Sequence, residues 1–169
     1  MMRARIAAAQ AAVVTALLLQ ATLVAPVATF AQLSLPAVLV AAIAVNCGPG
    51  TGISVGFGAG LVADLGSTHP AGVLALCWLC LGVVCGLLGE TARSLRAQVV
   101  LIGVGCAVSG SFVTLLLTVL GAAGATARAA AGELLPSIGG DLLLALIVTP
   151  VVRWFLRSQA LRVPAAGHG

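Results

Sequence analysis

Asp64 is the residue with the clearest potential for chemistry, because it is the only acid inside an apolar stretch of the chain. An ionisable side chain in such a stretch is costly, and by default it marks an ion or proton path. A path needs further polar groups, and the candidates Gln20, Asn46 and Thr114 are uncharged. Because a polar turn (66–69) follows Asp64, we favour a structural carboxylate that binds backbone amides or hydroxyls near the membrane interface.

The five cysteines raise the question of metal or redox chemistry. Cys77 and Cys80 have the spacing of a CxxC motif, and Cys85 and Cys106 follow it in the sequence. The motif lies within an apolar stretch that has no second CxxC and no ligand histidine. An apolar environment disfavours the thiolate that binds metals. We therefore interpret these cysteines as small apolar residues, and we expect no metal and no cofactor.

Enzyme signatures are absent from the sequence. A zinc-protease His-Glu-x-x-His motif, a phosphate-binding loop and a dinucleotide fingerprint do not occur. His69 is the only histidine outside the C-terminal tail, and Ser109-Gly110-Ser111 has no obvious base partner. An intramembrane hydrolase that uses His69 is conceivable but lacks positive support, so we expect a protein that is not an enzyme.

Small residues recur every fourth position before Asp64. They are Gly48, Gly52, Gly56 and Gly60. Residues four apart form one ridge of a helix, and in lipid such small-residue ridges allow two helices to approach closely. The spacing predicts either packing against another helix of the same chain, which we favour, or a docking face for a second membrane protein.

Composition decides the class of protein that holds these residues. The chain has 169 residues, of which 61% are hydrophobic and only 7% charged, and its mean hydropathy is +1.21. An average soluble domain is about one quarter charged, so a soluble protein and a disordered chain are both excluded. We predict one all-α integral-membrane domain over residues 1–169. The net charge of +4 implies no nucleic-acid partner, because the arginines lie near the ends of the apolar stretches.

About six transmembrane helices account for the apolar stretches, since one crossing needs about 20 apolar residues. The predicted helices cover residues 6–30, 33 or 35–45, 52–65, 71–89, 99–121 and 141–156. The second and third are short and flank Gly48-Pro49-Gly50, which favours a turn, so a hairpin that does not fully cross is an alternative. Residues 120–140 are predicted as a loop or an interfacial helix.

The arginines predict the topology, because short arginine-rich loops remain in the cytoplasm. With six helices, seven of the eight arginines fall on one side. They are Arg3 and Arg5, Arg93 and Arg96, and Arg153, Arg157 and Arg162. We therefore expect both termini in the cytoplasm. The alternative for the first stretch is a signal peptide ending near Thr29-Phe30-Ala31, but its apolar part exceeds the signal-peptide length of about 7–15 residues.

Residues 56–72 resemble the hallmark of the MreD family of bacterial rod-shape-determining membrane proteins. That hallmark combines Gly-Phe, Gly-Leu, an aspartate before an apolar residue, a short polar turn and a Pro-x-Gly that opens the next helix. The matching residues are Gly56, Phe57, Gly60, Leu61, Asp64, Leu65, Pro70 and Gly72. The chain length and Pro150 in the last predicted helix also fit this family.

The resemblance implies a non-enzymatic scaffold subunit of the cell-elongation complex in the bacterial plasma membrane, which supports peptidoglycan synthesis and cell shape. Its partners would be the lipid bilayer, an MreC-like single-span protein and, through that protein, an MreB-type cytoskeleton and peptidoglycan synthases. The residues that would shape helix packing or partner docking are Gly52, Gly56, Phe57, Gly60, Asp64, Ser67, Pro70 and Gly72.

The MreD family is similar in fold to the substrate-binding subunits of energy-coupling-factor vitamin transporters, which supplies the alternative function. Ala4, Ala8 and Ala12 resemble the alanine-spaced docking face of those subunits. The predicted helices offer few polar groups to bind a vitamin, whereas a ligand pocket has several convergent ones. We therefore favour the scaffold subunit.

Overall fold

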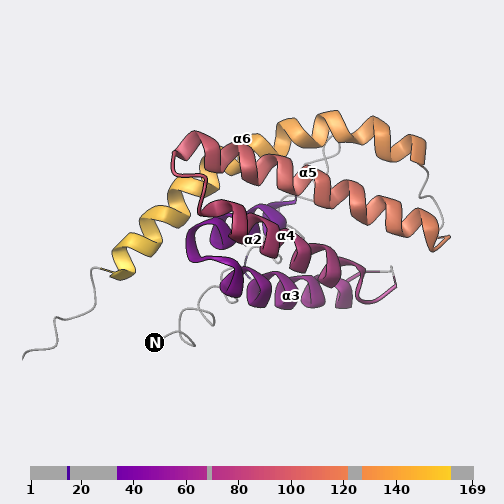
Figure 1. Ribbon diagram of the computed structural model, residues 1–169. Coiled ribbons are helices and arrows are strands. Elements are labelled where there is room, and N and C mark those ends of the chain that lie inside the picture. The colour runs from indigo at the N-terminus through magenta and orange to yellow at the C-terminus, as the bar shows by residue number, and fades with distance from the viewer. Residues whose placement is uncertain (1–14, 16–33, 68–69, 122–126, 161–169) are drawn as a thin grey trace, which may run out of the picture.

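The computed structural model describes residue 15 and residues 34–67, 70–121 and 127–160. All regular structure in these ranges is α-helical (Figure 1), as the sequence predicts. The five helices are α2 (Leu35–Cys47), α3 (Pro49–Leu65), α4 (Val73–Gly89), α5 (Leu95–Val119) and α6 (Ala127–Ala160). The predicted first helix, over residues 6–30, lies outside the described residues apart from Thr15, which is helical.

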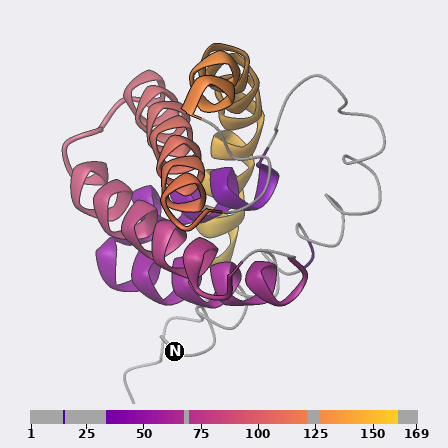
Figure 2. The same cartoon turned by 90° about the vertical axis from the view of Figure 1, so that its right-hand side faces the viewer.

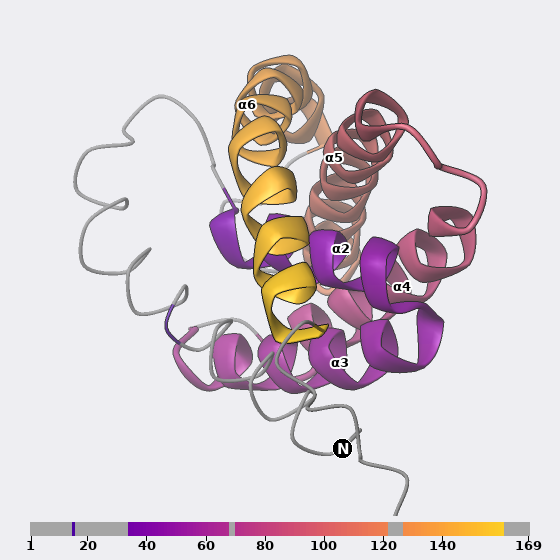
Figure 3. The same cartoon turned by 90° about the vertical axis from the view of Figure 1, so that its left-hand side faces the viewer.

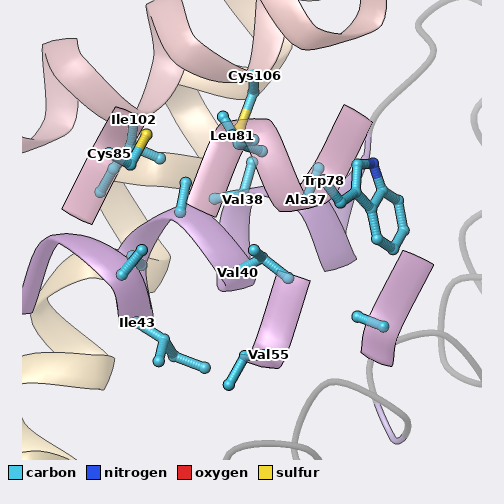
Figure 4. Close-up of a cluster of buried hydrophobic side chains, with 14 of the residues drawn as sticks. Ala37, Val38, Val40, Ile43, Val55, Trp78, Leu81, Cys85, Ile102 and Cys106 are labelled. Atoms are coloured by element: carbon cyan, nitrogen blue, oxygen red, sulfur yellow. The ribbon is translucent and has the colours of Figure 1, made fainter. Parts of the chain in front are cut away.

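The central helix is α2, which contacts all four of the others (Figure 3). Nine of its 13 residues are buried. It is apolar on every side, as a helix surrounded by other helices must be. Figure 4 shows Val38, Val40 and Ile43 of α2 among side chains from the helices around it. The core is therefore built around α2, and the remaining helices surround it.

The helices that surround α2 form two pairs, which lie on opposite sides of it. Figures 1 and 2 show α3 and α4 as one pair and α5 and α6 as the other. Both pairs expose large apolar side chains on their outer faces, including Leu61 of α3 and Val108 of α5. A water-facing surface is not normally so apolar over a contiguous area. The exterior therefore has the composition that contact with lipid requires.

Among the described residues, two helical segments are long and apolar enough, by length and composition, to cross a bilayer. They are Leu95–Val119, which is α5, and Ile138–Leu156, which lies within α6. With 13 residues, α2 is shorter than the roughly 20 residues that one crossing needs. It extends for only about 20 Å at the usual rise per residue. α2 is therefore too short to cross a bilayer as a straight helix by itself.

The largest difference from prediction concerns α6. Instead of a helix over 141–156 preceded by a loop or interfacial helix, α6 is continuous from Ala127 to Ala160. The added segment begins with an alanine-rich stretch, and alanine has the highest helix propensity. The helix nevertheless contains Pro136 and the Gly139-Gly140 pair. Residues of these types are the usual sites of helix bends, and Figure 1 shows the two ends of α6 running in different directions.

Two helices begin earlier than predicted because local capping extends them. α3 begins at Pro49, since proline at the first helical position already has the required φ and needs no N–H partner. α5 begins at Leu95, after Ser94, whose hydroxyl oxygen accepts a 3.1 Å hydrogen bond from the Ala97 N–H. Between α2 and α3 the chain turns at Gly48, where φ is +85°, a value that glycine adopts without strain.

Candidate functional site

The predicted glycine ridge lies against α4. A Cβ atom at Gly52 would overlap the carbonyl oxygen of Gly82, and one at Gly56 would overlap the carbonyl oxygen of Trp78. At Gly60 it would overlap the backbone of α4 itself, at Ala75. The two backbones are thus in direct contact along α3. Of the two alternatives for the ridge, the structure shows packing within the chain, and α4 covers the face that a second protein would need.

α4 contributes a glycine ridge of its own, which the sequence analysis missed. A Cβ atom at Gly86 would lie 2.5 Å from the Pro49 Cα, and one at Gly89 would lie 2.6 Å from the Val45 carbonyl oxygen. Gly82, opposite Gly52, and Gly86 run antiparallel to the ridge on α3, whereas Gly89 packs against α2. The sequence signal was present, because Gly82 and Gly86 have the same four-residue spacing.

Asp64 binds the first turn of α4. Its Oδ2 atom accepts hydrogen bonds from the Gly72 N–H at 2.9 Å and the Ala75 N–H at 3.0 Å, while Oδ1 accepts one from the Leu74 N–H at 3.1 Å. These N–H groups are among the donors that a helix cannot satisfy internally. The negative carboxylate also stabilises the positive end of the helix dipole. Asp64 is only 4% exposed, so the end of α3 caps the beginning of α4 inside the protein.

The turn between these helices positions that cap. Gly72 has φ of +99°, a left-handed conformation that favours glycine, and this conformation points its N–H at Asp64. The Ser67 hydroxyl donates a 2.9 Å hydrogen bond to the Asp64 carbonyl oxygen. Pro70 is exposed. Of the eight predicted site residues, six therefore belong to one packed unit made of the glycine ridge, Asp64, Ser67 and Gly72.

Phe57 lies on a face of α3 next to that of the glycines, since each residue of the exposed row directly follows a ridge glycine or Asp64. It belongs to an exposed row with four-residue spacing, which we call the α3 outer stripe. The stripe consists of Ile53, Phe57, Leu61 and Leu65. Phe57 is 48% exposed and Leu65 82% exposed. Residues four apart lie on one helix face, so the stripe is a continuous apolar surface that no described part of the chain covers. The predicted site thus divides into an internal packing face and an outer face.

The CxxC residues do not converge on a common point. Cys77 is buried, while Cys80, three residues later, is exposed. Cys85 and Cys106 are buried and belong to the apolar core (Figure 4). Within the described residues, no three histidine, cysteine or acidic side chains are grouped so that they could hold a metal ion.

Four buried polar side chains on α5 and α6 form a feature that the sequence analysis did not predict. They are Gln98, Ser109, Asp141 and Thr149, each less than 9% exposed. One side-chain oxygen of each has no hydrogen-bond partner in the described part of the chain. The sequence places Asp141 at the first position of the predicted helix over residues 141–156, where burial is not expected. Because α6 begins earlier, Asp141 lies in the interior of the helix. The residue is only 3% exposed.

No model of a known protein family matches the chain, and neither a curated protein nor a solved structure matches it. The relationship to the MreD family therefore stays a prediction that depends on residues 56–72.

Substitution of Gly56 by alanine tests the contact between the two backbones. Because the added methyl group would overlap the Trp78 carbonyl, we expect the free energy of unfolding to fall by about 1–3 kcal/mol. The matched control is Gly110→Ala on α5, where nothing lies within 4 Å of the added atom. Thermal unfolding in detergent should show a lower Tm for the first variant alone. Equal Tm values would contradict the close contact.

Substitution of Asp64 by asparagine tests the cap. Asparagine keeps the shape but loses the charge and one of the two acceptor oxygens, which serve three N–H groups. We expect a loss of about 1–3 kcal/mol in the free energy of unfolding. The control is Glu90→Gln, since Glu90 is an exposed acid beyond the end of α4. A variant at Asp64 as stable as this control would show that the cap contributes little.

Proposed function

We propose that the chain is a non-enzymatic, multi-pass scaffold subunit of the bacterial plasma membrane, of the MreD type, which supports cell elongation through membrane-embedded contacts. One observation carries this proposal. Four of the eight residues on which the MreD resemblance depends form one contiguous structural unit, in which Gly56 and Gly60 contact α4 and Asp64 binds the Gly72 N–H. A motif whose residues contact one another has a physical reason to occur together.

The proposed arrangement in the membrane has six spans, with both termini in the cytoplasm. The two candidate spans in α5 and α6 and the apolar exterior support insertion into lipid. Arg93 and Arg96 are exposed at the junction of α4 and α5, where the positive-inside rule favours the cytoplasm. This orientation places the turn between α3 and α4, with Pro70, on the opposite side of the membrane.

The α3 outer stripe is the proposed contact surface for an MreC-like single-span partner. Three of its four residues, Phe57, Leu61 and Leu65, belong to the resemblance, and all three are exposed. A single transmembrane helix presents a complementary row at the same spacing. The glycine ridge is unsuitable for this role, because Gly60 is packed against Ala75 and a leucine there would separate α3 from α4.

The transporter alternative depends on Ala4, Ala8 and Ala12, which lie outside the described residues. No observation on the described helices favours it. Thermal stabilisation of the purified protein by a vitamin would support it in place of the scaffold function, because a ligand stabilises the folded state to which it binds.

Docking on the outer stripe is tested by the double variant Phe57→Ala, Leu61→Ala. Both side chains are exposed, so we expect an unchanged Tm but a reduction of about tenfold or more in co-purification of the MreC-like partner. The control pair is Val104→Ala, Val108→Ala, which removes exposed apolar groups from α5. If both pairs retain the partner and normal cell shape, the stripe is not the contact surface.

Reporter fusions test the proposed topology. Green fluorescent protein fused after Arg96 or at the C-terminus should fluoresce, because it folds in the cytoplasm. Alkaline phosphatase fused after Pro70 should be active, because it requires the outer side. Reversed signals at any of these junctions would contradict six spans with both termini in the cytoplasm.

A further inference from the structure

The two buried acids of the described chain have opposite hydrogen-bonding states. Asp64, at 4% exposure, uses both carboxylate oxygens to accept three backbone N–H bonds. Asp141, at 3% exposure, has an Oδ1 atom without any hydrogen-bond partner in the described residues. A buried polar atom without a partner is rare in native proteins and usually indicates a water or ion that completes it. Asp141 is therefore the acid that needs a ligand.

Asp141 lies where three helices meet. The backbone of Ser34 is a hydrogen-bonding partner of its carboxyl group, and Ser34 is the N-cap of α2, with a side chain that makes no capping bond. On α5, Cys106 is close enough to Asp141 to interact with it electrostatically. Ser109 follows one turn later, is 8% exposed, and has a hydroxyl oxygen without a partner in the same described part. Two oxygens without a partner in the described residues, Asp141 Oδ1 and Ser109 Oγ, thus lie on the packed helices α6 and α5.

Among the residues whose side chains the structure describes, none supplies a positive charge to this junction. Arg153, on the same helix, lies 12 residues further along, or about 18 Å at the rise of an α-helix, and no arginine of the described segments pairs with Asp141. The titratable group that interacts with the carboxyl group is the Cys106 thiol on α5, which itself has Cys85 of α4 as a neighbour. The beginning of α2 supplies only a partial positive charge. An ionised carboxylate in such a place is costly unless an ion compensates it.

We propose that Asp141 is an exchangeable binding site for a monovalent cation, either a proton or Na⁺, at the junction of α2, α5 and α6. A proton binds as an O–H on Oδ1. Na⁺ takes the place of that proton, which leaves to solvent, and Na⁺ is coordinated by oxygen atoms. The Ser109 hydroxyl, on the neighbouring helix α5, is the nearby candidate in sequence terms, since it follows Cys106 by one turn and has no partner in the described residues. This role goes beyond scaffolding, because it makes the α5–α6 side of the bundle responsive to ions while α3 and α4 carry the partner surface.

Labelling with a hydrophobic carbodiimide tests the site on the wild-type protein in nanodiscs. The reagent reacts with protonated carboxyl groups in apolar surroundings, and mass spectrometry identifies the labelled residue. We expect labelling of Asp141 at acidic pH and its loss as the pH rises and the proton leaves. Loss of labelling on addition of Na⁺ at constant pH, with choline at equal ionic strength as the control, identifies Na⁺ as a ligand. Loss with pH alone identifies the proton.

Asp64 is the internal control, because both of its oxygens are already bonded, so it should stay unlabelled throughout. A second measurement uses Asp141→Asn. The Tm of the wild-type protein should change with Na⁺ concentration and pH, and the Tm of this variant should not. If this variant fails to fold, the labelling of the wild-type protein still decides the matter. Labelling of Asp141 that is absent, or that neither pH nor Na⁺ changes, overturns the proposal and leaves a buried water as the partner of Oδ1.

Discussion

Direct contact between the backbones of α3 and α4 is the constraint on which the rest of this structure depends. In an apolar environment two helices gain nothing from excluding water, so they associate through van der Waals packing and hydrogen bonds. Glycines on both helices permit that packing, from Gly52 opposite Gly82 to Gly86 opposite Pro49. The same register brings Asp64 to the first turn of α4. With this pair in place, α2 is enclosed from one side and α5 and α6 enclose it from the other.

Local patterns were enough to predict the helices α2 to α5 and the part that residues 52–72 play in helix packing. Apolar length and the Gly48-Pro49-Gly50 turn placed α2 to α5 within a few residues of their observed bounds, because these signals act over neighbouring residues. The continuity of α6 was not predicted, since Pro136 and Gly139 lower local helix propensity and only tertiary contacts with α5 offset this. The partner of the glycine ridge was also beyond local reasoning, because it depends on the antiparallel register of two helices.

The two acids show most clearly where sequence reasoning ends. Asp64 stood out because it interrupts an apolar stretch, and its structural role as a carboxylate near backbone amides could be anticipated from the turn that follows. Asp141 stood at the predicted boundary of a helix, where an acid is ordinary. Its burial results from the meeting of α2, α5 and α6, and no spacing within the sequence encodes that junction. Hydrogen bonding, rather than burial, distinguishes the two acids, since both are almost fully enclosed.

The glycine content of α3 has a consequence for biogenesis. Five of its 17 residues are glycine, and each costs about 1 kcal/mol of helix stability relative to alanine. The segment alone is therefore a poor helix, and its stability comes from α4, which leaves the ribosome later. Asp64 likewise has no N–H groups to bind until residues 72–75 have been synthesised. The folding of α3 is therefore completed only once α4 is present, and the two helices form as one unit.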